Sequence, residues 1–311
     1  MRVLWLTVDR SKRALQWFDP FRIKAMEAME REGWECVVKV RDVPNPIKPW
    51  ALQAISDPSA APPMVTRAEM AGFDFVYTDL LAAFLWEPWE SCRGGMACLM
   101  ADQHGDLVST VHRTALALGI AVWYVYRDAL ARFWPDLPRG WWLPYGYDPE
   151  IFFPRNRWDQ RRSGVLMTGQ MGGGVYADRQ DVHSALCHHP LYHQEPRPAE
   201  TAIGETQPRG SAYAALLSSY KMSVATHSAY GYTVTKYYEI AACGTALLCN
   251  AGREMVALGF IPGVHYIPLP DRGPGFASAV REIATCTNRA HDVAAAGHEL
   301  VKERHTTEKD V

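Results

Sequence analysis

The sequence predicts an α/β protein made of two Rossmann-like domains that face each other across a cleft. Three observations predict this class. The chain has 311 residues, which is long for a single hydrophobic core. Its first forty residues read as strand, loop, helix and strand, the opening of a doubly wound parallel sheet. A similar βα series begins after Pro154, so we expect two similar domains.

The first half opens with the clearest strand of the chain. Residues 2–8, RVLWLTV, form a continuous apolar run, which is typical of a buried parallel strand. Pro20 then begins a segment with apolar residues at helical spacing, which ends at Gly33. The stretch 43–63 is rich in Pro, Ala and Ser and favours an irregular connection. We further expect strands at 34–40, 73–79, 96–102 and 120–126, a helix at 105–118 and a linker at 141–154.

The second half repeats the pattern with a glycine-rich turn after its first strand. The strand at 164–169 leads into GQMGGG, and the helix that follows ends near Cys187. A loop rich in His and Pro comes next. We then expect helices at 212–220, 235–243 and 275–286, strands at 221–227 and 245–250, and a last helix near the end. The predicted domains are 1–153, 154–285 and a C-terminal helix or tail at 286–311.

Composition excludes several classes of protein. The formal net charge of -2 gives no overall attraction to nucleic acid or acidic membranes. No apolar stretch approaches the roughly 20 residues of a membrane span, and the charged N-terminus does not resemble a signal peptide. Seven scattered cysteines without a CxxC pair favour reduced thiols. We therefore expect a cytoplasmic protein without a membrane span or zinc site.

Two segments of the second half are candidates for binding a phosphorylated ligand. In 168–174, TGQMGGG, glycines after a strand let the backbone approach a phosphate, although a plain flexible turn fits equally well. In 228–244, a turn at Gly231 enters a helix that carries Lys236 and Glu239. That carboxylate can accept hydrogen bonds from both hydroxyls of a ribose. The backbone N–H groups at the start of the helix can bind a pyrophosphate. The alternative to a binding site is a capped amphipathic helix with an exposed Lys/Glu pair. The spacing of the two residues, taken alone, favours this alternative.

A third candidate lies in the first half. Asp102 and His104 follow a predicted strand, and a histidine beside a carboxylate is suited to remove a proton from an acceptor hydroxyl. A structural histidine is the other interpretation. The histidines at 183–193 lack the spacing of a metal site, so no metal is expected. The arginines between 155 and 162 are typical of a solvated face, but they also suit a phosphate-rich acceptor.

Four stretches of the second half resemble glycosyltransferases of the GT-B fold, in particular the spore-coat (CgeB-like) and group 1 relatives. The stretches follow the family's order and spacing: WLPYGYDPEIFFP, VLMTGQMGGGVYADR, YAALLSSYKMSVATHSAYGYTVTKYYEIAACGTALL and LGFIPGVHYIPL. The third is the most specific, because it contains the family's donor-site helix. The first half matches in outline only. One position departs from the pattern: retaining relatives often carry a glutamate where this chain has Gly231.

The resemblance implies a metal-independent enzyme without a cofactor that moves a sugar from a nucleotide-sugar, most often a UDP-sugar, to an acceptor hydroxyl. Glu239 would bind the ribose, Lys236 would neutralise the leaving phosphate, and His104 or Asp102 would be the base. The residues implied at the donor are Gly169, Gly172, Gly173, Tyr176, Arg179, Tyr230, Gly231, Tyr232, Thr233, Thr235, Lys236 and Glu239.

Three questions stay open at this stage. The acceptor is a small molecule, a protein, a glycan or a hydroxymethylated base in DNA. Because Gly231 removes a sugar-binding carboxylate, retention or inversion of configuration is undecided. The alternatives to a transferase are a nucleotide-sugar epimerase on the same fold and a non-catalytic binding module of that fold.

Overall fold

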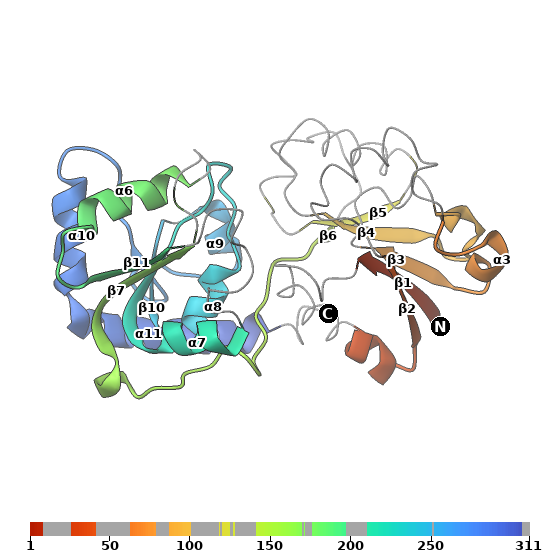
Figure 1. Cartoon of the computed structure of the whole chain (residues 1–311), viewed down its shortest axis with the longest axis horizontal. Coiled ribbons are helices and arrows are strands. Elements are labelled where there is room, and N and C mark those ends of the chain that lie inside the picture. Colours follow the sequence, from red (N-terminus) through yellow and green to blue (C-terminus); the bar gives the residue numbers. More distant parts are fainter. Residues whose placement is uncertain are drawn as a thin grey trace. The chain divides into compact units, whose positions relative to one another are not determined.

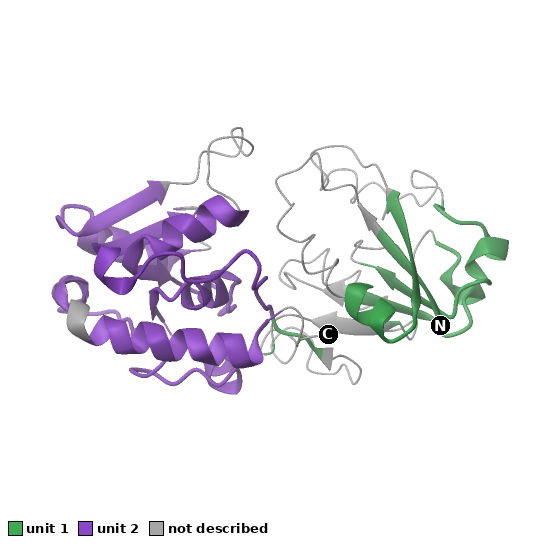
Figure 2. Cartoon of the chain, turned by 90° about the horizontal axis from the view of Figure 1, so that it is seen from below, with its two compact units in different colours: residues 1–144, 311 green, residues 145–310 purple. Residues whose placement is uncertain are grey.

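The chain forms two compact units in a computed structural model. The structure describes residues 1–8, 26–41, 63–78, 87–100, 118, 120–124, 127, 141–169, 171, 176–196, 210–250 and 252–306. The units are Met1–Pro144 and Tyr145–Asp310, coloured separately in Figure 2. The division thus falls after Pro144, whereas the sequence placed it after residue 153. Of the C-terminal segment that the sequence set apart at 286–311, the described residues 286–306 lie in the second unit.

The first unit is built on a six-stranded, all-parallel sheet in the order β2-β1-β3-β4-β5-β6 (Figure 1). The central strand β1 buries Val3, Leu4, Trp5 and Leu6 in succession, as expected for a strand covered on both faces. The ring of Trp5 lies 4.0 Å from that of Tyr77 on the neighbouring strand. The elements are β1 (Arg2–Val8), β2 (Glu35–Arg41), α3 (Arg67–Met70), β3 (Phe75–Thr78), η4 (Trp89–Ser91), β4 (Met96–Met100), β5 (Ala121–Tyr124) and β6 (Trp141–Trp142).

The second unit is built on a five-stranded, all-parallel sheet in the order β11-β10-β9-β7-β8. In Figure 1, α6 and α10 pack together on one face of this sheet, and α8 and α11 pack together on the other. The elements are η5 (Trp158–Gln160), β7 (Arg162–Gly169), α6 (Ala177–Leu186), β8 (Tyr192–Pro196), α7 (Gly210–Ser218), β9 (Tyr220–Ala225), α8 (Lys236–Ala242), β10 (Ala246–Cys249), α9 (Arg253–Ala257), β11 (Ile267–Pro268), α10 (Phe276–Thr285) and α11 (Thr287–Arg304).

The strand order of the second unit contains a topological switch point. From β7 the chain moves outward to β8, and it then returns past β7 to form β9, β10 and β11 in the opposite direction. In doubly wound sheets, ligands bind outside the carboxyl ends of the strands at such a point. The ends of β7 and β9 are therefore the place where this unit is expected to hold a ligand.

The predicted class, two Rossmann-like α/β domains, is confirmed by the two parallel sheets, while the cleft between them stays a prediction. Two element predictions were wrong. The linker at 141–154 begins with β6, whose Trp141 pairs with Trp123 of β5. The His/Pro-rich loop after Cys187 contains β8, an edge strand that pairs with β7. An edge strand with a solvent-facing side can carry polar residues, so β8 lacks an apolar run. The predicted helix at 105–118 lies outside the described residues, except for residue 118.

Candidate functional site

The glycine that ends β7 gives space to two cationic side chains. Gly169 has φ +96°, and a Cβ placed there would overlap Lys236 Nζ and come within 3.0 Å of Arg179 Nη1. Lys236 Nζ donates to the carbonyl oxygen of Thr168, 2.7 Å away. Because any side chain at Gly169 would displace one cation or both, glycine is required here for close approach as well as for conformation. The result is a positively charged corner at the switch point.

Arg179 reaches this corner from the first turn of α6. Its residue is buried, with 3% of its surface exposed, and its guanidinium lies over the ring of Tyr176, 4.2 Å from the centroid. Such a cation–π contact holds the planar group in a fixed orientation. Tyr176 itself directly precedes α6 and is partly exposed.

Glu239 lies one turn after Lys236 on the same face of α8. Burial of its carboxyl raises its pKa to about 7, and the Lys236 ammonium acts in the opposite direction. The residue still keeps part of its surface accessible. A desolvated carboxylate has lost hydrogen bonds to water, so hydroxyl groups that donate to it are strongly favoured. Glu239 is therefore a suitable acceptor for a pair of ligand hydroxyls.

Tyr213 of α7 completes this side of the site. Its hydroxyl lies 2.9 Å from Thr168 Oγ1. Burial, reinforced by the nearby Glu239 carboxylate, raises the pKa of Tyr213 well above its usual range. Tyr213 consequently stays a neutral phenol. Nothing in the sequence pattern singles out Tyr213, because it lies within an ordinary apolar helix.

The loop between β9 and α8 contains a tight turn. The amide of Gly231 donates to the carbonyl oxygen of Ser228 at 2.8 Å, and Tyr230 N donates to Ser228 Oγ at 3.3 Å. Gly231 is exposed with φ +81°, and no atom lies within 4 Å of a Cβ added to it. Tyr230 is partly exposed and Tyr232 is buried, with their rings 5.6 Å apart. The turn explains why glycine stands at 231, since φ there is left-handed.

The same loop is anchored by a buried glutamate that sequence reasoning missed. Glu254 of α9 is 3% exposed, and its Oε2 accepts a hydrogen bond from Thr233 N at 2.9 Å. Thr235 then leads into α8, and its carbonyl oxygen accepts from Glu239 N at 3.1 Å. The anchor fixes the loop between its turn and the helix. A lone Glu after Gly-Arg in the sequence carries no signal for this contact.

A second missed feature is a polar network next to the positive corner. Asp178 of α6 contacts Asn250 Nδ2 and Arg272 Nη2, and His227 Nδ1 lies 3.5 Å from Asp178 Oδ2. Arg272 Nε also pairs with Asp181 Oδ2 at 2.7 Å. These residues follow three strands and begin one helix, so they meet at the carboxyl edge. Because these residues are far apart in the sequence, the sequence pattern did not predict that they are in contact.

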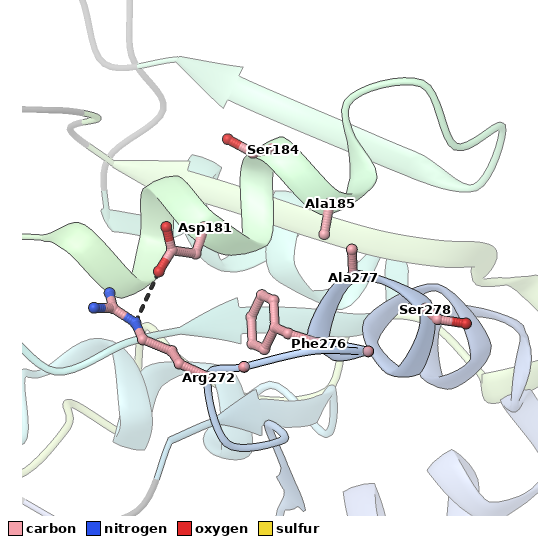
Figure 3. Close-up of a pocket in the computed structure, with 9 residues that line it drawn as sticks. Asp181, Ser184, Ala185, Arg272, Phe276, Ala277 and Ser278 are labelled. Carbon is pink, nitrogen blue, oxygen red and sulfur yellow. Dashed lines mark ion pairs between the residues drawn. The ribbon is translucent and has the colours of Figure 1, made fainter.

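A groove of about 570 Å³ is lined by Asp181 and Arg272, two residues of this network (Figure 3). In Figure 3, Arg272 reaches across to Asp181 of α6, and Phe276 lies between α6 and α10. The groove contains none of the predicted donor residues. Its lining residues are Asp181, Ser184, Ala185, Arg272, Gly273, Gly275, Phe276, Ala277 and Ser278.

The arginines that follow the linker have mainly structural partners. Arg161 is buried and donates to the carbonyl oxygens of Asn156, Cys243 and Gly244. It therefore caps the C-terminus of α8, where a positive charge is favourable. Arg155 donates to a backbone carbonyl and stacks on a neighbouring ring, and Arg162 donates to a tyrosine hydroxyl. Arg155, Arg157 and Arg162 are exposed, and Arg157 pairs with Asp159 on the surface.

The remaining predicted residues are not described. Asp102, His104, Gly172 and Gly173 lie outside the described residues, so their roles stay predictions. Within the described part of the chain, no group of three or more His, Cys, Asp or Glu could hold a metal ion. The helices described there include none with the length and apolar character needed to cross a bilayer. All seven cysteines are free thiols.

Comparison with known proteins finds a family model that matches the C-terminal part. Residues 184–311, less than half of the chain, match the family model of glycosyl transferase-like proteins. This part is therefore similar to glycosyl transferase-like domains. The match includes α8 with Lys236 and Glu239, together with the Glu254 anchor, whereas Gly169 and Arg179 precede it. A comparison with curated proteins finds no match.

Solved structures of the GT-B fold are similar to this chain, and they show its fold. Sucrose-phosphate synthase from Thermosynechococcus elongatus is similar over 100% of this chain and 96% of its own, with a TM-score of 0.66 and 14% identity. HepE from Anabaena in complex with UDP-glucose is similar over 99% and 96%, with a TM-score of 0.57 and 12% identity. A glycosyltransferase from Rickettsia africae is similar over 99% and 95%, with a TM-score of 0.57 and 9% identity.

Proposed function

We propose that this protein is a glycosyltransferase that moves a sugar from a nucleotide-sugar, most often a UDP-sugar, to an acceptor hydroxyl. The observation that carries the proposal is the pairing of a desolvated carboxylate with a cation on one face of α8. Glu239, with a pKa raised to about 7, lies one turn from Lys236, which reaches the end of β7 at the switch point. A nucleoside diphosphate carries ribose hydroxyls and negatively charged phosphates, which are complementary to this carboxylate and this cation.

In this proposal the second unit binds the donor. Glu239 accepts hydrogen bonds from the ribose hydroxyls, and the positive corner of Lys236 and Arg179 at Gly169 receives the diphosphate. The anchored loop from Tyr230 to Thr235 lies along the diphosphate and the sugar. Gly172, Gly173 and Tyr176 complete the proposed donor site. The HepE structures that contain UDP and UDP-glucose support a donor of this class.

The chemistry that this unit contributes is stabilisation of the leaving group. When the bond between the sugar and the diphosphate breaks, negative charge grows on the phosphate oxygens. Lys236 is held in place by Thr168 and Arg179 by Tyr176, so both cations are oriented before the reaction. With two fixed cations at the leaving group, we propose transfer that does not depend on a bound metal.

The acceptor side of the proposal rests on the sequence. His104, or else Asp102, would take the proton of the acceptor hydroxyl as the new glycosidic bond forms. Small molecules, proteins, glycans and a hydroxymethylated DNA base are all acceptors compatible with the proposal, and so are both stereochemical outcomes. A cytoplasmic location also belongs to the proposal, in keeping with seven free cysteines.

One observation favours a second candidate, a non-catalytic binding module. Gly231 stands where retaining relatives often have a glutamate, and its exposed surface leaves that space open. A binding module would hold the nucleotide-sugar without releasing its sugar. Incubation with UDP-glucose, followed by chromatography of UDP and free or transferred glucose, separates the two functions. Release of UDP supports the transferase, and an intact donor after prolonged incubation supports the module.

Donor binding is tested by thermal-shift and calorimetric titration with UDP, GDP, TDP and their sugars. Wild type is compared with Glu239→Ala and with Glu282→Ala, an exposed glutamate of α10 that serves as the control. We expect a nucleotide to stabilise wild type and Glu282→Ala, but not Glu239→Ala. If no nucleotide stabilises wild type, the proposed function is wrong. If Glu239→Ala binds as wild type does, the proposed site is wrong.

A further inference from the structure

His227 occupies a position at the switch point that the donor-site motif does not include. One residue, Thr226, separates it from the end of β9, and Met167 of β7 is paired with Val224 of β9, so both strands end at the same edge. The positive corner at Gly169 is thus on the adjacent strand, and parallel neighbours are about 4.8 Å apart. The side chain of His227 is 25% exposed, which leaves it accessible to a ligand.

The contacts of His227 Nδ1 indicate which ring nitrogen faces the ligand. Nδ1 lies 3.2 Å from the carbonyl oxygen of Ser228 and 3.5 Å from Asp178 Oδ2. Asn250 Nδ2, at 3.3 Å, already contacts the Asp178 carboxylate. Two acceptors beside Nδ1 favour the tautomer with its proton on that atom. Nε2 is then the nitrogen left to interact with a bound molecule.

Asp178 is held rigidly behind the imidazole. Arg272 Nη2 and Asn250 Nδ2 both contact its carboxylate, and Arg272 is itself fixed by Asp181, as Figure 3 shows. Asn250 Oδ1 accepts a hydrogen bond from the backbone amide of His227 at 3.1 Å. The same asparagine therefore contacts both the His227 backbone and the Asp178 carboxylate. Outer partners of this kind fix the orientation of a functional histidine.

The charges around His227 come from four elements. Arg179 joins Asp178 on α6, Lys236 and Glu239 lie on α8, Glu254 lies on α9, and Arg272 lies in the loop after β11. In the protein without ligand, these positively charged side chains and these carboxylates are therefore similar in number. A diphosphate adds two negative charges at the positive corner, where a further side chain that donates a charge-assisted hydrogen bond would stabilise it.

We propose that His227 is a third diphosphate-binding residue of the donor site, with Asp178 as its positioning residue. On binding of the nucleotide-sugar, the imidazole takes up a proton from solvent and donates a hydrogen bond from Nε2 to a phosphate oxygen, while Nδ1 keeps its proton toward Asp178. This inference rests on the proposed function and deepens it. It adds a hydrogen bond to phosphate, coupled to proton uptake, from His227, a residue outside the motif of α8 that contains Lys236 and Glu239.

Calorimetric titration with UDP-glucose tests the proposal. Its diphosphate is esterified at both ends, so the ligand itself has no group that titrates near neutral pH. Titrations in two buffers with different heats of ionisation give the number of protons taken up on binding, at about pH 7. Wild type is compared with His227→Gln and with His193→Gln. His193 is a matched control, because its Nε2 lies 3.5 Å from Glu195 on the edge strand β8.

We expect His227→Gln to bind UDP-glucose about ten- to a hundredfold more weakly, the loss of one charge-assisted hydrogen bond. It should also take up fewer protons than wild type, whereas its affinity for uridine is unchanged. Asp178→Asn provides a second variant if His227→Gln does not fold, and it too should lower proton uptake. His193→Gln should match wild type in each measurement.

The outcomes separate this inference from the proposed function. If wild type binds UDP-glucose and His227→Gln shows the same affinity and proton uptake, His227 does not contact the diphosphate and the inference is overturned, while the proposed function stands. An equal loss of uridine and UDP-glucose binding would indicate a structural role and would also overturn it. Failure of wild type to bind UDP, GDP, TDP or any of their sugars would overturn both.

Discussion

Lys236 Nζ donates a hydrogen bond to the carbonyl oxygen of Thr168 over 2.7 Å and so joins the first residue of α8 to the end of β7. The contact places the ammonium over Gly169, where a side chain would exclude it. It also fixes the face of α8 that presents Glu239. One hydrogen bond between a helix and a strand thus sets the spacing between the proposed ribose acceptor and the proposed phosphate site.

Gly169→Ala is predicted to impair donor binding more than stability. The added Cβ overlaps Lys236 Nζ and crowds Arg179, while the left-handed φ adds strain of about 1–2 kcal/mol. Gly275→Ala is the control, because Gly275 has φ +92° and no atom within 4 Å of an added Cβ. Both variants should lose similar stability in urea unfolding, but we expect at least a tenfold loss of UDP affinity in Gly169→Ala alone. Equal UDP affinity in the two would contradict the role of the corner.

Glu239→Gln is predicted to stabilise the protein without ligand at high pH. The folded pKa, about 7, lies above the ordinary value of 4.5, so the folded state binds more protons and the wild type loses free energy of unfolding as pH rises through that interval. Glutamine removes this dependence. Urea titrations should show the variant gaining on the order of 2 kcal/mol relative to wild type between about pH 4.5 and pH 8. A difference independent of pH would show that the carboxyl titrates normally.

Arg161→Ala is predicted to destabilise the second unit. The guanidinium donates to the carbonyl oxygens of Cys243 and Gly244 and to Thr245 Oγ1, which lose these partners on substitution. Unpaired buried groups cost about 1–3 kcal/mol each, so a total of about 3 kcal/mol is expected. Arg157→Ala, which breaks an exposed ion pair with Asp159, should change the free energy of unfolding by less than about 0.5 kcal/mol. Similar values for both would show that the capping contacts are dispensable.

Glu254→Ala is predicted to release the donor loop while leaving the sheet intact. The variant removes the acceptor of Thr233 N, whereas Glu254→Gln keeps an oxygen in that position. Hydrogen–deuterium exchange of a peptide covering 228–235 should speed up in the alanine variant and much less in the glutamine variant. Unchanged exchange in Glu254→Ala would mean that the loop is held by other contacts.

The sequence predicted best those elements that are buried on both faces. β1 is a continuous apolar run, β7 and β9 contain mostly buried residues, and helices with clear ends such as α6 and α8 were also found. β8 was missed because its residues YHQEP form a polar edge strand, and β11 because it consists of two residues, Ile267–Pro268. Neither has the periodicity from which a strand can be inferred.

The candidate site was predictable where it is local. Lys236 and Glu239 lie three residues apart within one recognisable motif. The network of Asp178, His227 and Asn250 was not predictable, since its members follow or precede different elements and only the strand register brings them together. For Arg161, a local pattern was misleading. The sequence suggested a solvated basic face, but the guanidinium is buried and donates hydrogen bonds to the C-terminal end of α8.

The switch in strand order has a consequence for how the protein folds. Thr168 and Lys236 are 68 residues apart, and the chain between them goes out to β8 before it returns as β9. Contacts of such long range form late, because the entropy of closing the loop is lost before they add stability. The protein would therefore bind nucleotide only after β7 and β9 have come together in the sheet. In refolding experiments, a fluorescent nucleotide should gain signal after far-ultraviolet circular dichroism has already recovered its helical amplitude.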